Sequence, residues 1–241
     1  MTIFSTRSIS LIIFMWVLLV KSTHLSGQSN EQLYAWESGV AVNYSLNSVW
    51  SFNTALSQRS FMTETSEEDQ RLAFTFFEID HFANARIHPN LRFALGYKYR
   101  RRHPIPSGRF EHRLTQQLAW QHTRSTVRLV SRIRAEQRFR NNGLAHRYRY
   151  RLSADFPLKG AKLDPKEFYL AFSNELLLEA QSESPTSFEN RFSGSIGFLF
   201  SKDVKAEVSA IFRYEDFNLD PFAIWFFNSR VLINIPDKSE S

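Results

Sequence analysis

No cysteine occurs in the 241 residues, glycine and proline number only 8 each, and no apolar run reaches 18 residues. The lack of cysteine excludes a disulfide scaffold, a thiolate metal site and a cysteine nucleophile. A membrane-spanning helix needs about 20 apolar residues, so none is expected. The chain also lacks GxSxG and HExxH motifs and a glycine-rich phosphate loop, which are typical of esterases, zinc enzymes and nucleotide-binding proteins.

Charged and apolar residues are nevertheless abundant. Hydrophobic residues make up 43% of the chain and charged residues 22%, a balance that indicates a folded protein. Lysine and arginine (30) outnumber aspartate and glutamate (24), and phenylalanine alone accounts for 23 residues. No linker, low-complexity tract or charge block divides the chain, so we expect one domain.

The first 27 residues have the pattern of a secretory signal peptide. Arg7 precedes the apolar run 11–20, and Lys21 follows it; small and polar residues then extend to Gly27. A basic segment, a short apolar run and a small residue before a polar stretch are typical of a cleaved signal. The alternative is an uncleaved N-terminal anchor. We therefore expect residues 1–27 to be removed and residues 28–241 to form the mature domain.

Strict alternation of apolar and polar residues recurs along the mature chain. In the segment 145–156, for example, Tyr148 and Tyr150 share one face, and Arg149 and Arg151 share the other. A period of two residues predicts β-strands. Eleven segments have this pattern: 34–46, 49–60, 71–86, 91–100, 109–121, 126–139, 145–156, 167–179, 190–200, 204–215 and 222–235. In 71–86 the alternation places Glu78 and Asp80 on the face of Phe74 and Phe76, which predicts a bulge or an early end there.

A soluble sandwich or a lipocalin-like barrel would also alternate, but three features favour a transmembrane barrel. The apolar faces carry many large aromatic residues, and the opposite faces carry arginine, glutamate and amides. The strands are about 10–14 residues long, enough to cross a bilayer at a tilt. In lipid, only a closed sheet pairs every backbone group. Aromatic residues near strand ends resemble interfacial girdles: Trp36, Trp50, Trp120, Tyr148, Tyr214 and Trp225.

The length and the connections predict the size and the topology. Single-chain bacterial barrels have even strand counts, so eleven visible strands predict a single antiparallel, up-and-down barrel of about twelve strands, or alternatively of ten. The missing strand would lie near the mature N-terminus. Tight turns, such as 47–48 and 201–203, mostly alternate with longer polar connections, which fits short periplasmic turns and longer outer loops. The longer connections are 61–70, 101–108, 140–144, 180–188 and 216–221, and 157–166 breaks the alternation.

The polar faces carry an unusual density of arginine with fewer acids. In a small barrel these groups are close enough to form ion pairs, so the inner face is expected to hold either a packed ionic network or an arginine-lined passage for anions. The residues of this predicted lumen network are Glu111, Arg113, Arg128, Arg132, Arg134, Glu136, Arg138, Arg147, Arg149, Arg151, Asp155, Glu175, Arg191, Glu207, Arg213, Glu215 and Arg230.

A second basic cluster lies where an outer loop is expected to begin and end. Arg100, Arg101 and Arg102 precede this loop, and Arg109 follows it. Outer-membrane lipid and lipopolysaccharide phosphates are the expected partners of such a rim; a solvated loop is the alternative. No pair of histidines has a metal-ligand spacing, so neither a metal site nor another cofactor is expected. An exported barrel also makes nucleic acid an improbable partner of the arginine stripes.

The sequence resembles a known family across essentially the whole mature chain. The segments that carry the resemblance are LRFALGYKYRRR at 91–102, FEHRLTQQLAWQ at 110–121, RLVSRIRAEQRF at 128–139, HRYRYRLSADFPL at 146–158, YLAFSNELLLEA at 169–180 and RYEDF at 213–217. Together they resemble the Bacteroidetes-type outer-membrane barrel proteins catalogued as domain of unknown function 2490. The resemblance implies a location in the outer membrane of a Gram-negative bacterium, and it brings no established activity and no catalytic residues.

The resulting expectation is a structural or narrow pore-type barrel with an arginine-rich, salt-bridged lumen. Small anions are the candidate solutes, and the sequence does not predict the oligomeric state. The alternative is an outer-membrane hydrolase that acts on lipid or lipopolysaccharide. Such an enzyme would need a serine, a histidine and an acid or amide close together at one membrane interface. His112 and His146 are the candidate histidines.

Overall fold

A computed structural model of the chain describes residues 33–65, 69–102, 109–141, 143–182 and 184–237. The predicted signal peptide therefore lies outside the described residues. No helix in the described ranges is long and apolar enough to cross a membrane. The described chain is all-β, with eleven strands: β1 (Leu33–Ser45), β2 (Trp50–Thr65), β3 (Asp69–His88), β4 (Leu91–Arg102), β5 (Phe110–Arg124), β6 (Val127–Arg140), β7 (Gly143–Pro157), β8 (Glu167–Gln181), β9 (Ser184–Leu199), β10 (Val204–Glu215) and β11 (Phe222–Ile235).

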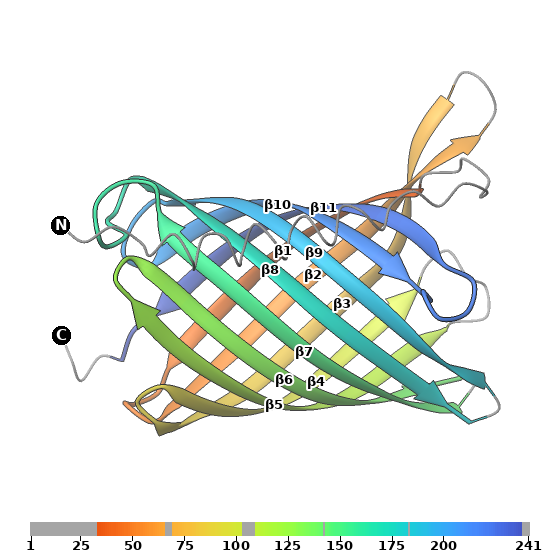
Figure 1. Cartoon of the computed structure of the whole chain (residues 1–241), viewed down its shortest axis with the longest axis horizontal. Coiled ribbons are helices and arrows are strands. Elements are labelled where there is room, and N and C mark those ends of the chain that lie inside the picture. The colour runs from red at the N-terminus through yellow and green to blue at the C-terminus, as the bar shows by residue number, and fades with distance from the viewer. Residues whose placement is uncertain (1–32, 66–68, 103–108, 142, 183, 238–241) are drawn as a thin grey trace, which may run out of the picture. The chain divides into compact units, whose positions relative to one another are not determined.

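The eleven strands form one closed barrel in which each strand pairs with its neighbour in sequence (Figure 1). These sequential pairs are antiparallel, from β1 with β2 to β10 with β11. The barrel closes where β1 pairs with β11 in a parallel register that runs from Leu33 opposite Ile224 to Tyr44 opposite Ile235. The closed sheet pairs the backbone groups of its first and last strands and leaves no exposed edge.

The predicted all-β barrel is confirmed, and all eleven predicted segments are strands. The strand number differs from the predicted twelve or ten, and the closing pair is parallel instead of antiparallel. The second difference follows from the first: when neighbouring strands alternate in direction, the first and the last strand of an odd set point the same way. The twelfth strand was predicted for the mature N-terminus, and residues 28–32 there lie outside the described residues.

The two ends of the barrel differ in their connections. We call the end that carries residues 46–49, 89–90, 125–126, 158–166 and 200–203 the turn end, and the opposite end the loop end. Four of the five expected long outer connections are shorter than predicted because the strands continue into them. β2 and β3, for example, pair as far as Thr65 opposite Asp69, beyond the last partners of β1 and β4 (Figure 1). The longest described connection, 158–166, lies at the turn end.

The irregularity predicted in the third segment is a β-bulge. Arg59 of β2 lies opposite Phe76, but the next residue, Ser60, lies opposite Phe74, so β3 has one extra residue there. An extra residue reverses which face the following side chains take. Beyond the bulge, Phe76, Glu78 and Asp80 therefore point into the barrel.

The outer face of the barrel is apolar around its whole circumference. Each strand exposes at least one large hydrophobic side chain on that face: Trp36, Leu56, Ile79, Leu95, Leu114, Ile133, Tyr150, Leu176, Ile196, Val208 and Val231. Aromatic rings gather toward both ends. Toward the loop end, Trp36 stacks on Phe227, and Phe212 packs on Trp225. At the turn end, the Phe198 ring contacts Phe168 and Phe200.

Inside the barrel, two aromatic rings lie directly on glycine backbone near the turn end. Phe82 covers Gly96 of the adjacent strand, and Tyr169 covers Gly197. A Cβ at either glycine would overlap the ring, so only glycine permits this close approach. The Tyr169 hydroxyl then donates a hydrogen bond to the carboxylate of Glu207. These two rings occupy part of the interior that the charged side chains leave free.

Candidate functional site: the charged interior of the barrel

Alternation along the strands brings the predicted charged residues to the inner face. All seventeen residues of the predicted lumen network lie on this face, as their strand registers and ion pairs place them. A cavity of about 490 Å³ lies among them, and its wall contains fourteen lysines and arginines but only six acids. The interior is therefore charged throughout and has an excess of positive groups.

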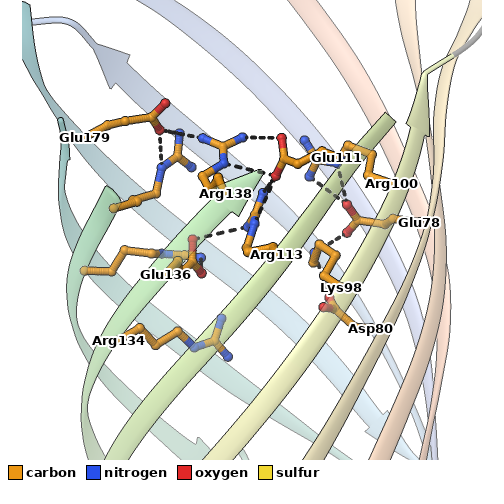
Figure 2. A network of polar contacts seen from close by, with 12 residues as sticks. Glu78, Asp80, Lys98, Arg100, Glu111, Arg113, Arg134, Glu136, Arg138 and Glu179 are labelled. Carbon is orange, nitrogen blue, oxygen red and sulfur yellow. Dashed lines mark hydrogen bonds and ion pairs between the residues drawn. The ribbon is translucent and has the colours of Figure 1, made fainter. Parts of the chain in front are cut away.

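Glu111 is the centre of the ion-pair network near the loop end (Figure 2). Its carboxylate accepts hydrogen bonds from Arg113 (Nη2, 2.5 Å), from Arg138 (Nη2, 2.8 Å) and from Arg140 (Nε, 3.3 Å). Arg138 also reaches Glu179 on β8 at 2.5 Å, so it links strands that are not neighbours in the sheet. One carboxylate thus holds three guanidinium groups in place, and the network extends along the inner wall from β5 to β8.

A second centre lies at Arg149. Its guanidinium group donates to Glu136 (Nη1, 2.9 Å) and to both oxygens of Glu175 (2.9 and 2.7 Å). Glu136 also pairs with Arg113 at 3.2 Å, which connects this centre with Glu111. Paired and hydrogen-bonded charges of this kind offset part of the desolvation that burial costs.

The bulge in β3 brings two more acids, Glu78 and Asp80, into the interior, although the alternation had placed them on the outer face. Glu78 accepts hydrogen bonds from Lys98 (2.6 Å) and Arg100 (2.8 Å), and Asp80 pairs with Lys98 at 2.7 Å (Figure 2). Arg100, assigned above to the lipopolysaccharide rim, therefore lies inside the barrel, because its partner Glu78 is there. Six more charged residues point inward, and the alternation alone would have identified them, because each lies an even number of positions from other inward-facing residues of its strand. They are Glu37, Arg59, Arg140, Glu179, Glu189 and Lys205.

A stack of alternating guanidinium groups and aromatic rings lies along the inner wall beside these ion pairs. Arg100 and Arg59 lie on the Phe76 ring, with their guanidinium carbons 4.1 and 4.5 Å from its centroid. Arg59 and Arg213 lie on the Phe226 ring at 4.6 and 3.7 Å. We call these five residues the cation–π stack; in order they are Arg100, Phe76, Arg59, Phe226 and Arg213. It is favourable because each ring presents a negative face to a partly desolvated cation.

Of the predicted rim, Arg101, Arg102 and Arg109 lie at the loop end with exposed side chains. The loop that they border, residues 103–108, lies outside the described residues. Arg102 and Arg109 line a second cavity of about 330 Å³ together with Arg140 and Glu111, so the rim adjoins the interior network. The described residues contain no group of three or more histidines and acids that could hold a metal ion.

The two candidate histidines of a hydrolase lie on the outer face. His112 is within hydrogen-bond distance of the Tyr97 hydroxyl (2.6 Å) and packs among Tyr99 and Phe110. His146 is one residue from the inward Arg147 and so has the outward parity. Across the described strands and turns, no hydrogen bond joins a histidine to a serine.

Comparison with known proteins gives one match. The family model described as "Protein of unknown function (DUF2490)" matches residues 35–220, from the start of β1 to just before β11. No curated protein and no solved structure shows a significant match. Because the matched region covers most of the chain and ten of its eleven strands, the chain belongs to the DUF2490 family of proteins of unknown function.

Proposed function

We propose that the mature chain is an outer-membrane β-barrel of a Gram-negative bacterium, with an interior that forms a narrow, anion-preferring path. The observation that carries this proposal is the inversion of polarity: the outer face is apolar, and the interior is ionic. A soluble protein buries its apolar groups and rarely exposes a continuous apolar surface of this extent. A closed sheet with such an outer face suits a hydrocarbon environment, because no backbone group is left unpaired.

The aromatic residues support the same location. Trp36 and Trp225 lie toward the loop end, whereas Trp50 and Trp120 lie toward the turn end. Two such belts suit the two interfaces of a bilayer. The signal-like residues 1–27 supply the export route. Recovery of the mature chain from a soluble periplasmic fraction without detergent would contradict this location.

In this arrangement the loop end faces outward and the turn end faces the periplasm, which is the usual orientation of bacterial barrels. Arg101, Arg102 and Arg109 would then lie at the outer rim, where the phosphates of lipopolysaccharide are the available partners. Guanidinium groups bind phosphate through paired, charge-assisted hydrogen bonds.

Ile133→Arg should lower the free energy of unfolding by about 2–4 kcal/mol in lipid vesicles. Ile133 is in the middle of β6 and is 58% exposed on the outer face, so a charge there would enter the hydrocarbon. Leu144→Arg is the matched control, because Leu144 is the second residue of β7 and lies near the loop end. We expect the control to cost about 0–1 kcal/mol. Chemical unfolding titrations of both variants measure the difference.

A water-soluble barrel would give a different pattern in that experiment. Both side chains would already be in contact with water, so arginine at either site would change the stability by only about 0.5 kcal/mol. Equal, small costs for Ile133→Arg and Leu144→Arg would therefore contradict the membrane location.

The pore is tested by recording single channels of the unmodified protein in planar bilayers. The fourteen cations and six acids of the cavity wall favour anions, and the long paired side chains on that wall would leave only a narrow path. We expect a low conductance, and in a salt gradient a reversal potential on the anion-selective side. A large, cation-selective conductance would refute the proposed path.

The hydrolase alternative gains no comparable support. Thr54 and Tyr97 are the hydroxyl groups that lie within hydrogen-bond distance of a histidine in the described part of the chain, and no acid completes either pair. Both pairs lie on the outer face, away from the charged interior.

A further inference from the structure

Four arginines on the turn-end side of the networks have almost no anionic partner. Arg132 and Arg151 lie directly opposite each other on β6 and β7, and Arg134 lies opposite the well-paired Arg149 in the next inward position. Arg230 projects from β11 and interacts electrostatically with Arg151. All of them line the 490 Å³ cavity. Like charges directly opposite in a sheet destabilise it, so this arrangement calls for a compensating charge.

The partners that these four residues do have are weak. Arg132 comes no nearer to a carboxylate than 4.0 Å, from Glu175. Arg134 donates to the uncharged amide oxygen of Gln117 at 2.6 Å. In the described ranges, no ion pair or side-chain hydrogen bond involves Arg151 or Arg230. We call Arg132, Arg134, Arg151 and Arg230 the surplus arginines.

The neighbouring acids cannot neutralise them, because each already serves other cations. Glu175 binds Arg149 through both oxygens, and Glu136 is shared by Arg149 and Arg113. Asp80 pairs with Lys98. Arg151 lies opposite Glu175, which is already occupied by Arg149. Glu207 lies opposite Arg230, but it accepts hydrogen bonds from Tyr169 and Lys205.

A second observation points to a missing acceptor in the same cavity. The Nε atoms of Arg149 and Arg213 are buried and have no hydrogen-bond partner within the described residues. Both residues line the cavity. A buried donor without an acceptor is unfavourable, and native proteins rarely keep one unless a bound water or ion supplies the acceptor.

We propose that the surplus arginines form a binding site for a doubly charged oxyanion of the phosphate or sulfate type. An oxyanion presents several acceptor oxygens, so that two of them can match the two N–H groups of one guanidinium fork, whereas chloride offers a single acceptor centre. The cavity has room for such an ion together with several waters, which occupy about 30 Å³ each in the liquid. The inference deepens the proposed anion path, because it names the class of anion and its place in the interior.

The site is tested by isothermal titration calorimetry of the mature barrel, refolded in maltoside micelles that contain no phosphate. Sodium phosphate is titrated at constant ionic strength, and sodium chloride is the comparison. We expect phosphate to bind at least about tenfold more tightly than chloride. Arg132→Gln combined with Arg151→Gln should weaken phosphate binding by at least tenfold. Arg128→Gln is the matched control, because Arg128 on β6 already pairs with Asp155 and should keep the affinity within about twofold.

Folding of each variant is checked by circular dichroism and by heat-modifiable mobility in gels. If the double variant does not fold, Arg230→Gln alone replaces it, with the same expected weakening. Phosphate that binds no more tightly than chloride, or binds the variant as tightly as the original protein, would overturn the proposal. Calorimetry does not depend on conduction, so phosphate binding by a barrel without channel activity would support the site and contradict only the pore.

Discussion

Replacing Glu111 with glutamine is expected to lower the free energy of unfolding of the barrel by about 3–5 kcal/mol. The glutamine keeps the size of the side chain but removes its charge, which leaves Arg113, Arg138 and Arg140 without their shared carboxylate. Glu111 is buried, so solvent cannot take its place. Arg138 would keep Glu179 and Arg113 would keep Glu136, but three positive groups would then face one another. Denaturant titration in lipid vesicles, followed by tryptophan fluorescence, measures the change.

Asp155→Asn is the control, because it removes a carboxylate that pairs with arginine but lies outside the buried network around Glu111. Asp155 pairs with Arg128 at 3.0 Å near the turn end, where the two side chains are 24% and 45% exposed. Water can replace this partner, and exposed ion pairs contribute only about 0–1 kcal/mol. Similar losses for the two variants would mean that the network around Glu111 is not a buried, interdependent unit.

The strands could be predicted from the sequence because each one carries its own alternating pattern. The closure could not be predicted in the same way. Whether the last strand pairs with the first, and in which direction, depends on the number of strands and not on any local pattern. The even count that is usual for bacterial barrels led to a twelfth strand, whereas Leu33–Tyr44 pair directly with Ile224–Ile235 in parallel.

The inward face was predictable wherever the strand is regular. The bulge opposite Arg59 and Ser60 reverses the parity of Glu78 and Asp80, so that their inward orientation could not be inferred from alternation alone. The ion-pair partner of each charged residue could not be predicted from the sequence either. It depends on the strand register and on how far the side chain extends from its strand. Arg138 and Glu179, for instance, belong to strands that do not pair with each other.

The cation–π stack and the Glu111 network together line the interior toward the loop end. The stack spans the wall from β4 through β3 and β2 to β11 and β10, and the network spans β5 to β8. Arg100 lies between them, since it rests on Phe76 and is opposite Glu111 in the β4–β5 register. Two strands remain: β1 contributes Glu37, which pairs with Arg59, and β9 contributes Arg191 and Glu189, which pair with each other beside Arg213. In the proposed path the rings would therefore help to narrow the opening, and two guanidinium groups lie on each ring.

Phe226→Ala is consequently expected to raise the single-channel conductance several-fold. The substitution removes a ring that is 2% exposed, and Arg59 and Arg213 lose the surface on which they lie, so both side chains gain freedom to move aside. It should also cost about 3–5 kcal/mol of stability, as loss of a buried aromatic ring does elsewhere.

Phe212→Ala separates the effect on conductance from the effect on stability, because Phe212 packs on Trp225 at the outer face and its loss should leave the conductance unchanged. Anion preference should persist in both variants, since neither removes a charge. An unchanged conductance in Phe226→Ala would place the narrowest part of the path elsewhere, at the turn end, where Phe82 and Tyr169 cover their glycines.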